Sequence, residues 1–243
     1  MKHLGVVDWG IGGVSILRAL EASLPGASFT YYSDSGFTPY GRLSAHALRE
    51  RLDVVIKKLA RQGVEGIVLA CNAASTTLAN GATYAVPAVG VIAPAVELLK
   101  RRRAKHIGIV GGRRTVLSRV YPRALAGSNI HVIQRIAQPL SAAIERGEFR
   151  NAAFERQVER IVSPLKHCDA VLLACTHYPA AYNVFENALP GVAIVDPASY
   201  VAASVAKTWT VTPSKGRTRF ETSGDARAMR TAIRIAWGAE PRR

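Results

Sequence analysis

An apolar run that ends at a cysteine occurs twice in this chain. Residues 66–70 are followed by Cys71, and residues 170–174 are followed by Cys175. Short runs of branched residues are typical of strands buried on both faces of a parallel sheet. Small hydroxyl-bearing residues follow Cys71 and favour a helix start, so we expect this cysteine between a strand and a helix. Parallel sheets bind their ligands at this edge.

The two runs are part of a longer repeat. Three pairs of landmarks lie 103 or 104 residues apart: Gly5 with Gly108, Cys71 with Cys175, and Pro94 with Pro197. A nearly constant offset predicts an internal duplication on the scale of a domain. The repeated order of strand, helix and strand favours parallel sheets with right-handed crossovers.

We therefore predict an α/β protein of two pseudo-symmetric domains, each a parallel sheet flanked by helices, with the active site in the cleft between them. The first domain comprises residues 1–92 plus 207–243, and the second comprises residues 93–206. A strand and an Ala/Arg-rich helix within residues 219–237 match neither copy, and we expect them to pack on the first domain.

The composition is that of a globular protein. About half of the 243 residues are hydrophobic (49%), enough for two domains with real cores. No apolar run reaches the roughly 18 residues of a membrane helix, and no basic-then-apolar leader follows Met1. Three cysteines do not form a disulfide framework. These features predict a cytoplasmic protein without membrane contact.

The net charge of +15 is unusually high. Such a charge suits a nucleic-acid partner, an anionic substrate or a solvated basic surface. The densest basic run is residues 100–103, which follows a helical pattern and suits the C-terminal end of a helix dipole. No aromatic residues interleave with it as base-stacking partners do, so a nucleic-acid partner is disfavoured.

Two cysteines at the tips of equivalent strands suggest proton transfer. If the two halves face each other, two thiols approach a bound ligand from opposite sides. Taking a proton from one face of a carbon and returning one to the other is racemisation, which requires one thiolate and one thiol. A free thiol has a pKa of about 8.5, within reach of neutral-pH chemistry. Asp8 at the end of the first strand and His177 beside Cys175 are the expected helpers.

Other interpretations apply to each cysteine taken singly. A cysteine after aliphatic residues is commonly a small buried hydrophobe. Zinc binding by Cys71, Cys175 and His177 is disfavoured because no closely spaced ligand pair is present, and a disulfide between the cysteines is disfavoured in the cytoplasm. Cys168 has no counterpart in the first half and is expected to be structural.

Seven segments of the chain resemble motifs of one known family, the cofactor-independent aspartate/glutamate racemases. They are Gly5-Val6-Val7-Asp8-x-Gly10-x-Gly12-Gly13, Tyr31-Tyr32-Ser33-Asp34-Ser35 with Pro39-Tyr40-Gly41, Ala70-Cys71-Asn72, Thr115-Val116-x-Ser118-x-x-Tyr121, Glu145-x-Gly147, Cys175-Thr176-His177-Tyr178-Pro179 and Phe220-x-Thr222-x-Gly224-Asp225. The resemblance covers the whole chain, and the second cysteine motif is its most specific part.

The resemblance implies an isomerase that encloses an amino acid, with glutamate the leading substrate, and that uses no cofactor and no metal. It implies Cys71 and Cys175 as the two bases, assisted by Asp8, Glu145 and His177. Residues expected to line the substrate site are Trp9, Pro39, Tyr40, Gly41, Asn72, Ala73, Thr115 and Thr176. The implied product is D-glutamate for cell-wall peptidoglycan, and a homodimer is a further expectation.

Two positions depart from the family pattern. Trp9 stands where the family usually has serine, and Ala73 where it usually has threonine. The usual serine and threonine hydroxyls help to hold the amino and carboxylate groups of the substrate. Ser75 and Thr76 are expected to be possible substitutes for them. These departures keep open a relative with another substrate (a different racemase, isomerase or lyase). The basic surface keeps open a further alternative, a non-catalytic protein that binds nucleic acid or a protein partner. The direction in which the Trp9 indole points decides whether a ligand of glutamate's size fits the site.

Overall fold

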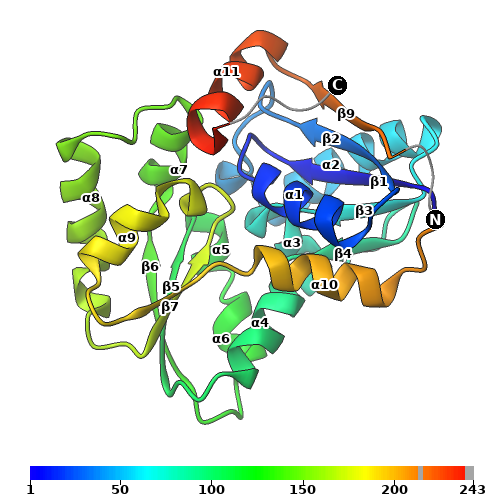
Figure 1. The fold of residues 1–243 in the computed structure, drawn as a ribbon. Helices are drawn as coiled ribbons and strands as arrows, with labels where there is room; N and C mark the ends of the chain where they lie inside the picture. Colours follow the sequence, from blue (N-terminus) through cyan, green and yellow to red (C-terminus); the bar gives the residue numbers. More distant parts are fainter. Residues whose placement is uncertain (213–215, 239–243) are drawn as a thin grey trace.

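Two parallel sheets organise the chain in the computed structural model, which describes residues 1–212 and 216–238 (Figure 1). The first sheet has the order β4-β3-β1-β2-β9, formed by β1 (His3–Asp8), β2 (Ser28–Ser33), β3 (Gly66–Leu69), β4 (Ala88–Gly90) and β9 (Thr218–Thr222). The second has the order β6-β5-β7-β8, formed by β5 (His106–Gly111), β6 (His131–Ile136), β7 (Ala170–Ala174) and β8 (Ala193–Val195).

The two sheets repeat one strand order, as the sequence predicts. In the first sheet β1 pairs with both β2 and β3, and β3 pairs with β4. In the second, β5 pairs with both β6 and β7, and β7 pairs with β8. β9 joins the first sheet alone, parallel to β2, so the expected return of the C-terminal segment to the first half is confirmed.

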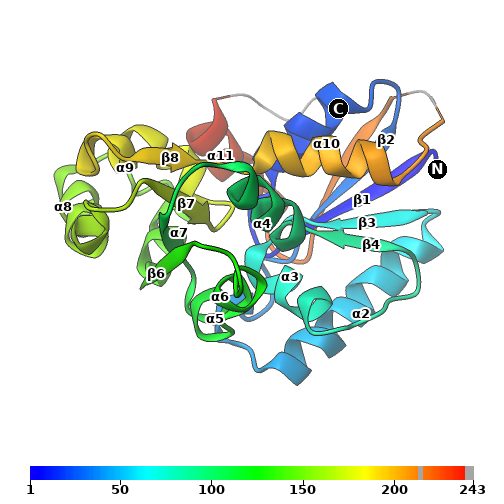
Figure 2. The same cartoon turned by 90° about the horizontal axis from the view of Figure 1, so that it is seen from below.

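Helices cover both faces of the first sheet. α1 (Val14–Ser23) and α10 (Ala198–Thr208) lie on one face, and α2 (Ala45–Arg61) and α3 (Asn72–Ala79) lie on the other (Figure 2). α11 (Ala226–Trp237) follows β9. The helices between β4 and β8 are α4 (Ile92–Arg101), α5 (Arg113–Leu117), α6 (Val120–Ala124), α7 (Gln138–Glu145), α8 (Ala152–Val162) and α9 (Tyr182–Ala188), with the 3-10 turns η2 (Ser163–Leu165) and η3 (Tyr178–Ala181). A further 3-10 turn, η1 (Tyr40–Arg42), lies between β2 and α2.

The largest buried cluster joins the two halves. It contains Ile11 and Leu17 from the first half together with Val110 and Tyr178 from the second. α10 follows the last strand of the second sheet but packs along α1 and also contacts α4. The domain division at residues 92 and 206 stays a prediction, and its C-terminal piece includes residues 213–215 and 239–243, which lie outside the described residues.

The fourth strand ends earlier than the sequence predicts. The run of apolar residues suggests a strand over 88–92, whereas β4 stops at Gly90 and α4 begins at Ile92. Pro94 explains the difference, because proline is well tolerated in the first turn of a helix and donates no bond to a sheet. Among the helices of the described ranges, none has both the length and the apolar character needed to cross a membrane.

The first cysteine lies where the sequence places it. Cys71 is the residue that precedes α3, and its carbonyl accepts a hydrogen bond from the Ser75 amide at 2.8 Å. The Ser75 hydroxyl donates to the carbonyl of Leu69 and accepts from the Val91 amide. Ser75 thus ties β3, α3 and the start of α4 together behind the cysteine.

Candidate active site

The carboxyl ends of the two sheets meet at one small cavity. Its walls come from both halves of the chain and include twelve of the thirteen residues that the sequence predicts for the site: Asp8, Trp9, Pro39, Tyr40, Gly41, Cys71, Asn72, Ala73, Thr115, Cys175, Thr176 and His177. The cavity encloses about 40 Å³. This is room for a few water molecules. An amino acid of glutamate's size enters only if the walls move apart.

Asp8 and Cys71 line the cavity on the side of the first sheet. Asp8 is fully buried and accepts hydrogen bonds from the amides of Trp9 and Gly13 and from the Thr176 hydroxyl at 3.1 Å. Burial raises the pKa of Asp8, against the opposing effects of His177 and of the Cys71 thiol. Burial also raises the pKa of Cys71 well above its usual value, and the negative charge of Asp8 adds to the rise. Cys71 is therefore held as a thiol beside a proton acceptor.

Cys175, His177 and Glu145 form a chain of contacts on the side of the second sheet. His177 Nδ1 lies 3.9 Å from Cys175 Sγ, and His177 Nε2 lies 2.7 Å from Glu145 Oε2. Burial alone would lower the pKa of His177, but its hydrogen bonds with Cys175 and Glu145 outweigh burial and raise the pKa well above the usual value. A protonated His177 donates to Glu145 and stabilises negative charge on the Cys175 sulfur.

Glu145 is the predicted site residue that does not line the cavity. Its carboxylate lies behind His177 and also accepts a hydrogen bond from the Ile11 amide at 2.9 Å. Glu145 ends α7 of the second half, whereas Ile11 belongs to the glycine-rich turn after β1. Its position suits a group that orients His177 and fixes its protonation, acting through the imidazole.

The glycine-rich turn after β1 allows close contact between the two halves. A Cβ on Gly10 would collide with the Glu145 carboxylate, and a Cβ on Gly12 would lie 2.7 Å from both the His177 amide nitrogen and Thr176 Oγ1. Glycine-rich turns between a strand and a helix often cradle phosphates, but this one lacks the full dinucleotide-binding spacing and has no P-loop lysine. Here the glycines instead let the chain pass directly against the residues of the second cysteine motif.

The loop after β2 supplies three more residues to the cavity, and a buried ion pair holds it. Arg51 of α2 donates to both oxygens of the fully buried Asp34, at 2.8 and 2.6 Å. The Tyr40 hydroxyl donates to Asp34 Oδ2 at 2.7 Å. The Arg51 guanidinium also lies 4.2 Å from the centre of the Phe37 ring. This network positions Pro39, Tyr40 and Gly41 at the cavity.

Asn72 is fixed by a contact between the halves. Its Oδ1 accepts a hydrogen bond from the Tyr121 hydroxyl at 2.6 Å, and both side chains are buried. Tyr121 lies in α6 of the second half. The bond leaves the Asn72 amide NH₂ as the donor end of the side chain, and Thr115 and Thr176 contribute hydroxyls to the same cavity.

The two departures from the family pattern both lie in the cavity wall. The Trp9 indole Nε1 donates to the carbonyl of Phe37 at 2.9 Å, and its ring centroid is 6.5 Å from that of His177. The indole ring therefore lies in the cavity wall near His177. Neither expected substitute hydroxyl reaches the cavity: Ser75 is bonded as described above, and Thr76 donates to the Ala73 carbonyl at 2.7 Å.

Four further residues line the cavity without having been singled out in the sequence: Gly112, Gln138, Ser141 and Ala174. Gln138 Oε1 accepts from the Arg113 amide at 3.0 Å, and its Nε2 donates to the Ser141 hydroxyl at 3.2 Å. Ala174 directly precedes Cys175, and Gly112 follows β5 at the equivalent strand end. Ala174 and Gly112 could have been predicted, because parallel sheets bind ligands at the carboxyl ends of their strands. Gln138 and Ser141 lie in the first turn of α7, where the sequence has no comparable signal.

The third cysteine is remote from this chemistry. Cys168 is buried in the main core cluster, 6% exposed, before β7. Across residues 1–212 and 216–238, no three His, Cys, Asp or Glu side chains gather closely enough to hold a metal ion.

Comparison with known proteins identifies the family to which this chain belongs. A sequence profile described as Asp/Glu/Hydantoin racemase matches residues 4–205, so this chain belongs to that family. The chain is 30% identical to the glutamate racemase of Ectopseudomonas mendocina, a match that covers 98% of this chain and 95% of the relative.

Two solved structures are similar over nearly their whole length. The glutamate racemase of Thermus thermophilus in complex with β-chloro-D-alanine has a TM-score of 0.84 and 31% identity, covering 96% of this chain and 92% of that one. The glutamate racemase of Francisella tularensis in complex with D-glutamate has a TM-score of 0.85 and 25% identity, covering 98% and 94%. The predicted two-sheet α/β fold is confirmed by these relatives.

Proposed function

We propose that this chain is a cofactor-independent racemase that interconverts L- and D-glutamate by two-base proton transfer. The observation that carries the proposal is that two thiols from equivalent strand ends line one cavity, each with its own acid–base partner. Family membership and the D-glutamate complex of the Francisella relative support glutamate as the substrate.

The proposed chemistry uses one cysteine as thiolate and the other as thiol. A Cys175 thiolate beside protonated His177 takes the proton from Cα, so that the C–H bond breaks, the electron pair delocalises into the substrate carboxylate and an S–H bond forms. The Cys71 thiol gives its proton to the opposite face of Cα, and the resulting thiolate lies beside Asp8. The reverse direction uses the same groups with the roles exchanged.

The residue roles in this proposal follow the contacts. Asp8 accepts and returns the Cys71 proton, His177 does the same for Cys175, and Glu145 orients His177. Asn72, Thr115 and Thr176 offer polar groups to the amino and carboxylate groups of the substrate. Product D-glutamate serves cell-wall peptidoglycan, and the site requires no cofactor.

Cellular setting and assembly belong to the same proposal. Synthesis of a wall precursor places the enzyme in the cytoplasm. A homodimer is supported by β6, an edge strand on which Ile133 is 44% and Ile136 is 39% exposed, because exposed apolar edges favour association. Light scattering on the purified chain measures the assembly directly.

The direct test is an assay of racemisation in deuterated water. We expect each enantiomer of glutamate, supplied at low millimolar concentration, to lose optical activity and to acquire deuterium at Cα as it inverts. A panel of other L-amino acids and small dicarboxylates measures specificity in the same assay. Unchanged optical activity and no deuterium in either enantiomer of any of them would contradict the proposal.

A second candidate is a racemase of the same mechanism for an amino acid smaller than glutamate. The Trp9 ring in the wall, the cavity of about 40 Å³ and the missing hydroxyl at Ala73 support it. Smaller substrates need less room and fewer bonds to a side-chain carboxylate. Faster turnover of alanine than of glutamate in the panel would favour this candidate.

Restoring serine at position 9 tests the effect of the indole. We expect Trp9→Ser to raise kcat/KM for glutamate about tenfold, because the change frees volume and adds a donor worth roughly 1–1.5 kcal/mol. Trp9→Phe is the matched control, since it keeps a ring in the wall and adds no donor, and we expect no gain. An equal gain in both variants would show that loss of the hydrogen bond from Trp9 Nε1 to the Phe37 carbonyl, rather than the volume freed in the cavity, raises kcat/KM.

A further inference from the structure

A second, strongly basic groove adjoins the candidate active site. It encloses about 620 Å³ and is lined by Gly41, Arg42, Leu43, Ala45, Asn80, Arg113, Arg114, Leu117, Ser118 and Arg123. One wall is formed by η1, by the start of α2 and by Asn80, the residue after α3; α5 and α6 form the other wall. Gly41 lines both this groove and the active-site cavity.

The charge of this groove is not compensated by the protein. Its lining includes four arginines and no carboxylate. Among the described residues, no ion pair within 4.0 Å joins any of the four to Asp or Glu. Two grooves beside α8 contain carboxylates as well as cations: Glu148 accompanies Arg156 in one, and Glu155 and Glu159 accompany it in the other.

Two of the four guanidiniums are already held in place. Arg114 donates to the Leu43 carbonyl at 2.9 Å and to Thr76 Oγ1 at 3.1 Å, both across the groove on the first half. Arg123 donates to Asn80 Oδ1 at 3.1 Å. A guanidinium carries five N–H donors in a fixed plane, so these bonds orient the groups without using all of their donors. Positioned arginines lose little entropy when they bind an anion.

Arg42 and Arg113 complete the set from opposite walls. Both are exposed, and Arg42 lies in η1 while Arg113 begins α5. Four like charges around one groove repel each other unless a counter-charge enters. Arginine clusters match phosphate and carboxylate oxygens through paired hydrogen bonds. The groove volume also falls in the range of small-ligand sites, about 300–1,000 Å³.

We propose that this groove binds a small polyanion carrying two or more phosphate or carboxylate groups. The ligand bridges the two halves, because its anionic groups reach Arg42 on one side and Arg113 and Arg123 on the other. Bound there, it draws together the walls that Arg114 already connects, next to the loop that carries Gly41. The binding site is independent of which substrate the active site takes.

The test is calorimetric titration of the full chain with inorganic tripolyphosphate at about 150 mM salt, where diffuse attraction is largely screened. We expect saturable one-to-one binding. Arg42→Gln, Arg113→Gln and Arg123→Gln should each weaken it about tenfold, the loss of one charge-assisted contact. A parallel titration with citrate distinguishes a phosphate site from a polycarboxylate site. Tighter binding of tripolyphosphate identifies the first, and tighter binding of citrate identifies the second.

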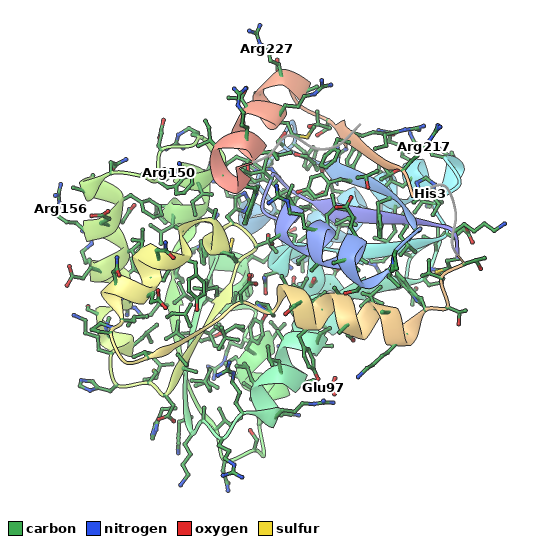
Figure 3. All side chains as sticks on the ribbon, viewed as in Figure 1. His3, Glu97, Arg150, Arg156, Arg217 and Arg227 are labelled. Carbon is green, nitrogen blue, oxygen red and sulfur yellow. The ribbon has the colours of Figure 1, made fainter. Side chains whose placement is uncertain are left out.

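Arg156→Gln is the matched control. Arg156 projects from the periphery of the second half on α8 (Figure 3), and its loss changes the net charge by the same amount. We expect binding to this variant to equal that of the parent chain. Absence of saturable binding by both anions, or equal weakening by Arg156→Gln, would overturn the proposal. Thermal unfolding of each variant, with and without tripolyphosphate, verifies that it is folded and that only groove variants lose the ligand's stabilisation.

Discussion

Replacing Cys175 with serine is expected to lower kcat for racemisation of glutamate about 1,000-fold. A serine hydroxyl is a far weaker acid than a thiol, so the variant lacks the group that exchanges a proton with one face of Cα, and general acid–base catalysis contributes about 10²- to 10⁴-fold. Cys71→Ser should lose a similar factor, because inversion needs both faces. The measurement is loss of optical activity at saturating substrate.

Deuterium incorporation separates the two variants. Each retains one thiol and should still exchange the Cα proton of the single enantiomer that this thiol faces, without inverting it. The two variants should therefore exchange opposite enantiomers. Cys168→Ser is the control, since Cys168 lies in the core away from the cavity, and its turnover should stay within about twofold of the parent. Undiminished racemisation by Cys175→Ser would rule out the two-thiol mechanism.

A second large loss of activity is expected when one methyl group is added to Gly12. Gly12→Ala should lower kcat/KM for glutamate about 100-fold, because the added Cβ would lie 2.6 Å from His177 Nδ1 and 2.7 Å from the His177 amide nitrogen. The backbone of the second cysteine motif must shift to make room. A displacement of about 1 Å at catalytic groups can cost this factor.

A stability control distinguishes displacement from partial unfolding. Gly127 has φ +78 and no neighbour within 4 Å of an added Cβ, so Gly127→Ala strains the backbone at a site remote from the cavity. We expect it to lower the free energy of unfolding by about 1 kcal/mol and leave kcat/KM nearly unchanged. Equal losses of activity in Gly12→Ala and Gly127→Ala, in proportion to stability, would refute the contact argument.

The duplication was accessible from sequence because it rests on local patterns. Buried parallel strands produce short apolar runs, and the spacing of Cys71 and Cys175 repeats wherever the same unit repeats. The order β8-β7-β5-β6 matches β4-β3-β1-β2 for this reason. Element boundaries are harder to predict: Ile92 is as apolar as a strand residue, yet it begins α4, which has Pro94 in its first turn.

The composition of the site was also largely predictable, whereas the function of each contact was not. Strand-end rules and the family resemblance identify twelve residues of the cavity. They do not indicate that the Glu145 carboxylate lies behind His177, because that position depends on how α7 packs against the turn after β1. Gln138 was missed since its position comes from a bond to the Arg113 amide, a contact between distant segments.

The sequence alone determined which reactive groups this protein has at its strand ends, namely two thiols at equivalent positions, Asp8 at the end of the first strand and His177 two residues after Cys175. Those features depend on residue type and on spacing along the chain. The tertiary structure decided the room around the thiols, which the Trp9 ring and the glycine-mediated contact of the two halves restrict to about 40 Å³. Volume is set by side chains from separate segments that meet only after folding, so no local pattern encodes it.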